Sequence, residues 1–223
     1  MSYDFQAEIN WLCQVLPTIG SPVVFCHNDL QGGNILQRMS SSKPMGKNTI
    51  GGSGLVAIDF EFCAYNYRAY DIANHWAEWI YDYGNKEYPY YSVNHNKAPT
   101  IDQKVNNYSF FEYFKNWIIH VLEEMIDVFA SAFCLQMEFL QRYSHEIFKN
   151  SAPVKDILGE IDFFSAVPDI VWALWCIDRA VHSDIKFGYW HYAAHRMHDY
   201  LRRKETMKET IQQTDVTSNG AEK

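Results

Sequence analysis

An octet with the spacing H-x-D-x-x-x-x-N, residues 27–34, constrains the fold of this chain more than any other feature. Short apolar runs flank it, residues 23–26 before it and residues 35–36 after it, and such runs predict strands. Two adjacent glycines inside the octet let the loop turn tightly enough for Asp29 and Asn34 to face one cavity. The sequence therefore predicts a strand, a polar loop and a second strand.

A second polar group follows the next predicted strand, residues 55–58, which leads into an Asp-Phe-Glu tripeptide that begins at Asp59. Phosphoryl transfer needs a carboxylate that orients the attacking hydroxyl and accepts its proton, and oxygen ligands that hold magnesium on the phosphates. Asp29 suits the first task, and Asn34 with Asp59 suits the second. An isolated octet or Asp-Phe pair is also compatible with an ordinary turn, but the ordered pair at strand ends favours a kinase.

The remainder of the chain has mainly helical spacing of apolar residues, so we expect an α+β chain that is mainly α. Residues 37–54 predict a flexible loop, residues 84–100 a second loop, and residues 212–223 a frayed tail. The predicted helices are residues 4–16, 69–83, 102–126, 127–149, 154–164, 168–184 and 190–210. The length and the lack of internal repeats predict a single domain over residues 1–223.

Composition and charge exclude several classes of function. Lys and Arg number 19 against 27 Asp and Glu, a formal net charge of −8, so no nucleic acid partner is expected and a small neutral or cationic ligand is favoured. Aromatic residues, with 7 Trp, 15 Tyr and 14 Phe, exceed what a core of this size usually needs. The five cysteines are scattered, and prolines and a glycine interrupt the uncharged stretch 9–28. We therefore expect reduced thiols, a cytoplasmic location and no membrane span.

The motifs depart from those of protein kinases. Asn28 stands where protein kinases carry Arg, and the metal tripeptide is Asp-Phe-Glu rather than Asp-Phe-Gly, with no Ala-Pro-Glu after it. The segments VVFCHNDLQGGNIL and LVAIDFEFCAYNYRAYDIANHWAEWIYDY resemble the choline/ethanolamine kinase family, from about residue 21 to about residue 205, and the choline-type branch is the more similar. The resemblance implies the mainly α-helical C-terminal lobe of a protein kinase-like fold, with a small β-hairpin element carrying the catalytic loop.

The resemblance also implies roles for the polar residues of the two motifs. Asp29 would be the catalytic base, and His27 would brace the loop around it. Asn34 and Asp59 would be magnesium ligands, and Glu61 would be a second carboxylate at the metal-nucleotide site. The implied cofactors are Mg²⁺ and ATP, the latter as co-substrate.

Choline carries a quaternary ammonium without N–H groups, so aromatic faces and a carboxylate must hold it. The resemblance places the choline cage at Tyr83, Trp172, Trp175 and Tyr192, with Glu78 nearby. Trp172 and Trp175 are three residues apart on a predicted helix and hence on one face. Without the resemblance, aromatic residues at this spacing would more often belong to a hydrophobic core.

Some positions depart from the family pattern or carry a separate expectation. The family commonly has Glu where residues 31–33 have Gly, and Phe62 replaces a frequent Tyr. Pro168 lies just before the tryptophans, where it would cost about 3 kcal/mol inside a helix and displace the pair unless it starts a turn. Arg68 is expected to form a structural ion pair with a nearby carboxylate such as Asp71.

The predicted function is ATP-dependent phosphorylation of choline, with ethanolamine as a secondary substrate, at the first step of phosphatidylcholine biosynthesis. The residues before His27 contain no glycine-rich strand-turn-strand, Lys or Arg, so the N-terminal nucleotide lobe is expected to be absent. The 223-residue chain alone is therefore expected to turn over choline at a trace rate at most.

Two other functions remain open at this point. One is a non-catalytic lobe that binds choline-like cations, or regulates a full-length choline kinase as a homo- or heterodimer partner. The other is a kinase for another small molecule, such as an aminoglycoside phosphotransferase, which shares the octet spacing. An aminoglycoside cleft is acidic, so the segment NHWAEWIYDY would have no evident purpose there.

Overall fold

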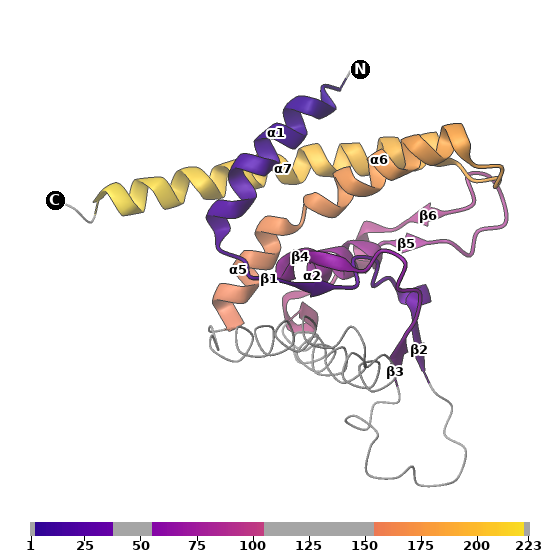
Figure 1. Ribbon diagram of the computed structural model, residues 1–223, viewed down its shortest axis with the longest axis horizontal. Helices are drawn as coiled ribbons and strands as arrows, with labels where there is room; N and C mark the ends of the chain where they lie inside the picture. The colour runs from indigo at the N-terminus through magenta and orange to yellow at the C-terminus, as the bar shows by residue number, and fades with distance from the viewer. Residues whose placement is uncertain (1–2, 38–54, 105–153, 221–223) are drawn as a thin grey trace, which may run out of the picture.

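The computed structural model describes residues 3–37, 55–104 and 154–220, which are mostly helical with a few short strands (Figure 1). The helices are α1 (Phe5–Val15), α2 (Arg68–Glu78), α5 (Val154–Phe164), α6 (Val167–His182) and α7 (Tyr189–Gly220), with the 3-10 turns η1 (Leu16–Ile19), η2 (Gly32–Asn34) and η3 (His95–Lys97). The strands are β1 (Val23–Cys26), β2 (Ile35–Gln37), β3 (Leu55–Ala57), β4 (Ala64–Tyr67), β5 (Tyr81–Asp82) and β6 (Ser92–Val93). The predicted α+β, mainly α character is thus present in the described residues.

The strands of the described residues form two-stranded antiparallel ribbons, in which β1 pairs with β4, β2 with β3 and β5 with β6. The expected strands on either side of the octet are present, but they do not pair with each other as a single hairpin. β1 instead pairs with β4, from Val23 opposite Tyr67 to Cys26 opposite Ala64. The mixed sequence AYNY of β4 has no strand periodicity that would predict this partner. The octet therefore joins two separate ribbons.

Some helix boundaries differ from those expected. α2 ends at Glu78, and Tyr81–Asp82 form β5 instead of continuing that helix. α7 continues past Gln212, where fraying is predicted, because no proline or glycine interrupts it before Gly220. Among the described helices, none combines the length and the apolar composition that a membrane span requires.

Parts of three predicted segments cannot be compared with the structure. The predicted helix 127–149 lies wholly outside the described residues. Of the predicted helix 102–126, only residues 102–104 are described, and they are helical. The predicted flexible loop 37–54 lies outside the described residues except for Gln37 at the end of β2.

Helix α2 is buried along its whole length, packed against α5, α6, β1 and β4. Its polar side chains must therefore find partners within the protein. Arg68 forms an ion pair with Glu160 of α5 at 2.7 Å, and Ser21 donates a hydrogen bond to the same carboxylate at 2.5 Å. The structural ion pair expected of Arg68 is confirmed, but the suggested partner Asp71 is wrong, because Asp71 accepts hydrogen bonds from backbone N–H groups of the octet, beginning with that of His27. The tertiary neighbour α5, distant in sequence, supplies the partner.

Helix α1 crosses α7 and is fastened to it by polar contacts (Figure 1). The carboxylate of Glu8 accepts a hydrogen bond from the Tyr200 hydroxyl at 2.5 Å and forms an ion pair with Lys204. The Lys204 ammonium also lies 4.5 Å from the ring centroid of Trp11. The N-terminal helix is therefore attached to the C-terminal helix, while α6 and α7 pack together along their length.

Candidate active site

A buried carboxylate from α2 holds the octet loop in its shape. Asn28 has φ of +64°, in the left-handed region that residues other than glycine adopt infrequently. Asp71 accepts hydrogen bonds from the backbone N–H groups of His27 at 2.9 Å and Asn28 at 2.8 Å. The Asn28 side chain donates to the carbonyl of Phe62 at 2.9 Å, and Nε2 of the buried His27 lies 2.9 Å from the carbonyl oxygen of Ile58. The loop is thus held by α2 and by the segment that follows β3.

Asp29 and Asn34, the octet residues selected for chemistry, lie in direct contact. The Asn34 amide nitrogen donates to Oδ2 of Asp29 at 3.0 Å and to its backbone carbonyl at 2.9 Å. Burial raises the pKa of Asp29 to about 7, and the negative charges of Glu78, Asp59 and Glu61 add to this rise against the opposing hydrogen bond from Asn34. The Asp29 carboxyl therefore changes its charge near neutral pH.

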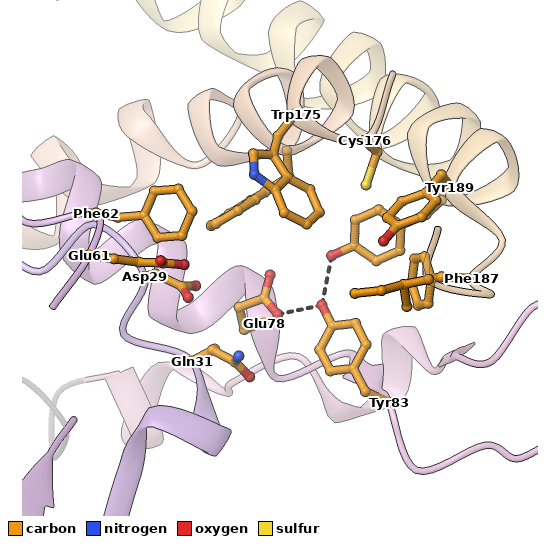
Figure 2. Close-up of a pocket in the computed structure, with 13 residues that line it drawn as sticks. Asp29, Gln31, Glu61, Phe62, Glu78, Tyr83, Trp175, Cys176, Phe187 and Tyr189 are labelled. Carbon is orange, nitrogen blue, oxygen red and sulfur yellow. Dashed lines mark hydrogen bonds between the residues drawn. The ribbon is translucent and has the colours of Figure 1, made fainter. Parts of the chain in front are cut away.

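Asp59 and Glu61 lie near this carboxyl, on the segment that follows β3. Asp59 has φ of +66°, so the chain turns sharply where β3 ends, and both residues are exposed. Figure 2 shows Glu61 directly beside Asp29. Within the described residues, no three acidic, His or Cys side chains converge into a closed metal site. The donor set of carboxylates and the Asn34 amide nevertheless fits Mg²⁺, which takes one or two carboxylates and completes its shell with water and substrate phosphates.

An aromatic pocket of about 300 Å³ opens beside Asp29 (Figure 2). Its wall is contributed by the octet, the segment after β3, α2, the residue after β5, and the two helices α6 and α7 with their connection. The lining residues are Asp29, Gln31, Glu61, Phe62, Glu78, Tyr83, Trp172, Trp175, Cys176, Ile185, Phe187, Tyr189 and Tyr192. Every residue expected in the choline cage lines this pocket, and so do Asp29 and Glu61, whereas Asn34 and Asp59 lie outside its wall.

The aromatic rings of the pocket pack against one another edge to face. Trp172 and Trp175 have ring centroids 5.7 Å apart at an interplanar angle of 80°. Phe62 meets Trp172 at 5.7 Å and 76°, and Trp175 meets Tyr189 at 6.2 Å and 63°. These contacts fix the orientation of the two indole rings at the pocket wall, and Trp175 remains 37% exposed. Aromatic faces arranged in this way attract a cation through their quadrupoles.

Pro168 does not displace the tryptophan pair. It lies in the first turn of α6, where a missing backbone N–H costs nothing and the fixed φ of proline suits the helix. The expected penalty of an interior proline therefore does not arise. Trp172 and Trp175 project into the pocket from the following turns of α6.

Glu78 is the carboxylate at the base of the pocket, and both its oxygens have partners. Tyr83 donates a hydrogen bond to Oε2 at 2.7 Å, and its hydroxyl also lies 2.7 Å from that of Tyr192 (Figure 2). The fully buried Arg196 forms an ion pair with Oε1, and its other guanidinium nitrogen contacts Asp169 at 3.0 Å. The Glu78 charge is therefore fixed in place and compensated.

Sequence reasoning did not assign Arg196, which pairs with Glu78 without lining the pocket, or Tyr189 and Cys176, which line it. Arg196 follows Tyr192 by one helical turn, so a charged residue on the same face of α7 was a usable signal. Tyr189 is the first residue of α7. Cys176 gives no signal in the sequence; burial raises the pKa of its thiol to about 12, so it forms a neutral part of the wall.

Comparison with known proteins yields one family. The family model for choline/ethanolamine kinase matches residues 2–201. Choline kinase alpha of Mus musculus is 34% identical over 93% of this chain and 39% of its own length. Choline/ethanolamine kinase of Homo sapiens is 33% identical over 91% of this chain and 43% of its own length. The chain thus spans about two fifths of the length of these curated relatives.

Among solved structures, a choline kinase from Cryptosporidium parvum Iowa II is 25% identical and superposes with a TM-score of 0.52, over 87% of this chain and 42% of that one. The Plasmodium vivax ethanolamine kinase shares the fold, with a TM-score of 0.54 over 90% of this chain and 40% of that one. Motifs, fold and family model agree over the same region of the sequence. This chain belongs to the choline/ethanolamine kinase family.

Proposed function

We propose that the protein phosphorylates choline, with MgATP as the phosphoryl donor and phosphocholine and ADP as the products. The observation that carries this proposal is that Asp29 lines the same cavity as the four aromatic cage residues. An alcohol whose cationic end lies among the aromatic rings would present its hydroxyl to this carboxylate. Asp29 then acts as the base that orients the hydroxyl and accepts its proton.

The pocket suits a quaternary ammonium better than a primary one. A primary ammonium brings three N–H donors that need acceptors when water is removed. Arg196 and Tyr83 already contact the two oxygens of Glu78, so this carboxylate has fewer free acceptor sites for such donors. Indole and phenol faces attract a trimethylammonium group without any acceptor. This supports choline as the preferred substrate and ethanolamine as a secondary one.

Magnesium would be held by Asn34, Asp59 and Glu61. When bound, the ion neutralises charge on the phosphates of ATP. Asn34 also steadies the Asp29 carboxyl through its amide, so one side chain serves both the base and the metal site. The trimethylammonium group of choline would lie in the pocket that Asp29 and Glu61 also line, and the negative charges of these two carboxylates favour its approach.

The alternative of a non-catalytic, choline-binding or regulatory lobe is retained as a second proposal. It requires only the aromatic pocket with Glu78 and not the magnesium ligands. An aminoglycoside substrate is disfavoured, since aromatic rings outnumber carboxylates in the pocket wall. We also propose a cytoplasmic location, because the described cysteines Cys13, Cys26, Cys63 and Cys176 are all free thiols.

Turnover and binding separate the two proposals. With choline and MgATP, an ADP-release assay on the protein should show choline-dependent turnover, and Asp29→Ala should lower kcat by about 100-fold or more with little change in KM, because loss of a base acts on the transition state. Tyr65→Phe, an exposed position outside the pocket, is the matched control and should leave both constants unchanged. Unchanged kcat in Asp29→Ala would contradict the base assignment. Calorimetry that finds choline binding without nucleotide binding or turnover would favour the non-catalytic lobe.

A further inference from the structure

We propose that Asn74 of α2 is a positioning residue that couples a cation in the aromatic pocket to the geometry of the loop that carries Asp29. The inference rests on the function proposed above. Asn74 does not line the pocket, and its side chain is fully buried. It touches a residue of the pocket wall with one end of its amide and the octet with the other.

The two hydrogen bonds of the Asn74 amide run in opposite directions. On the pocket side, the indole nitrogen Nε1 of Trp172 donates to Oδ1 of Asn74 at 2.7 Å. On the loop side, Nδ2 of Asn74 donates to the backbone carbonyl of Asn28 at 3.3 Å. An amide offers an acceptor on one atom and a donor on another from one short side chain. A buried asparagine is therefore the residue type that joins these two groups.

The carbonyl of Asn28 is an effective point from which to orient Asp29. It shares one planar peptide unit with the backbone N–H of Asp29, so a hydrogen bond to this carbonyl fixes the peptide that enters the catalytic residue. Asn28 itself has the positive φ described above and needs such support. Asp71 holds the other peptide of Asn28, through its N–H group. Asp71 and Asn74 lie three residues apart and hold the two sides of Asn28 from one face of α2.

A second, independent contact joins the same two regions. The ring of Phe62 packs edge-on against Trp172, and its backbone carbonyl accepts from the Asn28 side chain at 2.9 Å. Trp172 is thus connected to Asn28 both through Asn74 and through Phe62. A cation that restrains the indole in the pocket would restrain the loop through this packed, hydrogen-bonded network.

The test is amide hydrogen exchange of residues 27–30 with and without saturating choline chloride. In the unaltered protein, choline should slow exchange by about fivefold or more, the lower end of usual coupling strengths. Asn74→Leu keeps the branched shape of the side chain but removes both hydrogen bonds, so choline should slow exchange there much less. His75→Asn is the matched control, because His75 also holds the loop, at the Leu30 carbonyl 2.7 Å away, but does not line the pocket. In this control the loop loosens while the choline effect persists.

Trp172→Phe gives an independent variant if Asn74→Leu fails to fold. It replaces the indole by a smaller aromatic ring without the N–H, and it should likewise reduce the choline effect on the loop. In steady-state assays Asn74→Leu should lower kcat by about tenfold and change the choline KM by less than about threefold, a split that general loss of structure would not produce.

Calorimetry with choline separates failure of this inference from failure of the proposed function. Choline that binds every variant and slows exchange in Asn74→Leu or Trp172→Phe as much as in the unaltered protein would overturn the coupling. Choline that binds the unaltered protein without slowing exchange at residues 27–30 would overturn it as well. Absence of choline binding to the unaltered protein would contradict the proposed substrate itself, and the coupling would fall with it.

Discussion

Ionisation of the Asp29 carboxyl destabilises the folded protein, because the carboxyl is partly buried beside other carboxylates. Burial and three neighbouring carboxylates raise its folded-state pKa to about 7 from an ordinary value of 3.8. Because its folded-state pKa is raised, the Asp29 carboxyl keeps its proton in the folded protein at pH values at which the unfolded chain has already lost it. Stability therefore falls as pH rises from about 4 to about 7, because ionisation favours the unfolded chain in that window. A group that is unfavourable for folding but suited to proton transfer is typical of active sites.

Asp29→Asn should accordingly raise the thermal midpoint at pH 8 in metal-free buffer. The asparagine cannot ionise, and its carbonyl oxygen can still accept the hydrogen bond from Asn34. The gain in Tm should grow from pH 5 to pH 8, and scanning calorimetry across this range measures it. Glu61→Gln is the companion variant, since it removes one of the charges that raise the Asp29 pKa, and its gain should be smaller. A gain in Tm that does not vary with pH would show that Asp29 is not the titrating group.

At the scale of elements, the contact between α1 and α7 depends on one carboxylate. Partial burial acts to raise the pKa of Glu8, but hydrogen bonds from Lys204 and Tyr200 and the charges of Lys204 and Lys208 outweigh it and lower the pKa below 4.5. Because the folded-state pKa is the lower one, ionised Glu8 stabilises the fold at pH values above its unfolded-state pKa. This contribution is lost as pH falls through the folded-state pKa.

Glu8→Gln should therefore lower the free energy of unfolding by about 1 kcal/mol at pH 7, because it weakens a partly buried pair and its hydrogen bonds. The difference should shrink as pH falls through the folded-state pKa of Glu8, because the unaltered carboxyl then becomes protonated too. Glu205→Gln is the control on the same helix, since its pair with Lys208 is largely exposed and should contribute less than about 0.5 kcal/mol. Urea titrations of both variants provide the measurement. Equal losses in the two variants would refute a special role for the helix contact.

At the scale of the whole molecule, large apolar side chains are exposed on the ribbons around the octet. Val23 of β1 is 57% exposed, Tyr65 of β4 56% and Leu36 of β2 48%. Apolar surface of this kind favours association.

The 223-residue chain should therefore self-associate in solution, and light scattering should report a mass above 26.1 kDa that falls on dilution. Leu36→Lys should reduce this association by about tenfold in dissociation constant, because it places a charge in the apolar surface. Ile101→Lys, at a position 74% exposed on a different segment, is the control and should leave the mass unchanged. A mass of 26.1 kDa that does not change with concentration would contradict this expectation.

The local features of this protein could be predicted from the sequence. The octet, the strand before Asp59 and most helix positions follow from the spacing of apolar residues, from glycines and from the chemistry of short motifs. Resemblance to a family supplied the residues of the cage, which spacing alone could not distinguish from core aromatics. These signals are readable because each depends on residues close together in the chain.

Only the tertiary structure decided which distant residues meet. The pairing of β1 with β4, the Glu160 partner of Arg68 and the compensation of Glu78 by Arg196 all join segments far apart in the chain. The two hydrogen bonds of the Asn74 amide likewise join residues far apart in the chain. Such contacts leave no periodicity, because a buried polar group is satisfied by whichever partner the packing of separate elements brings within reach.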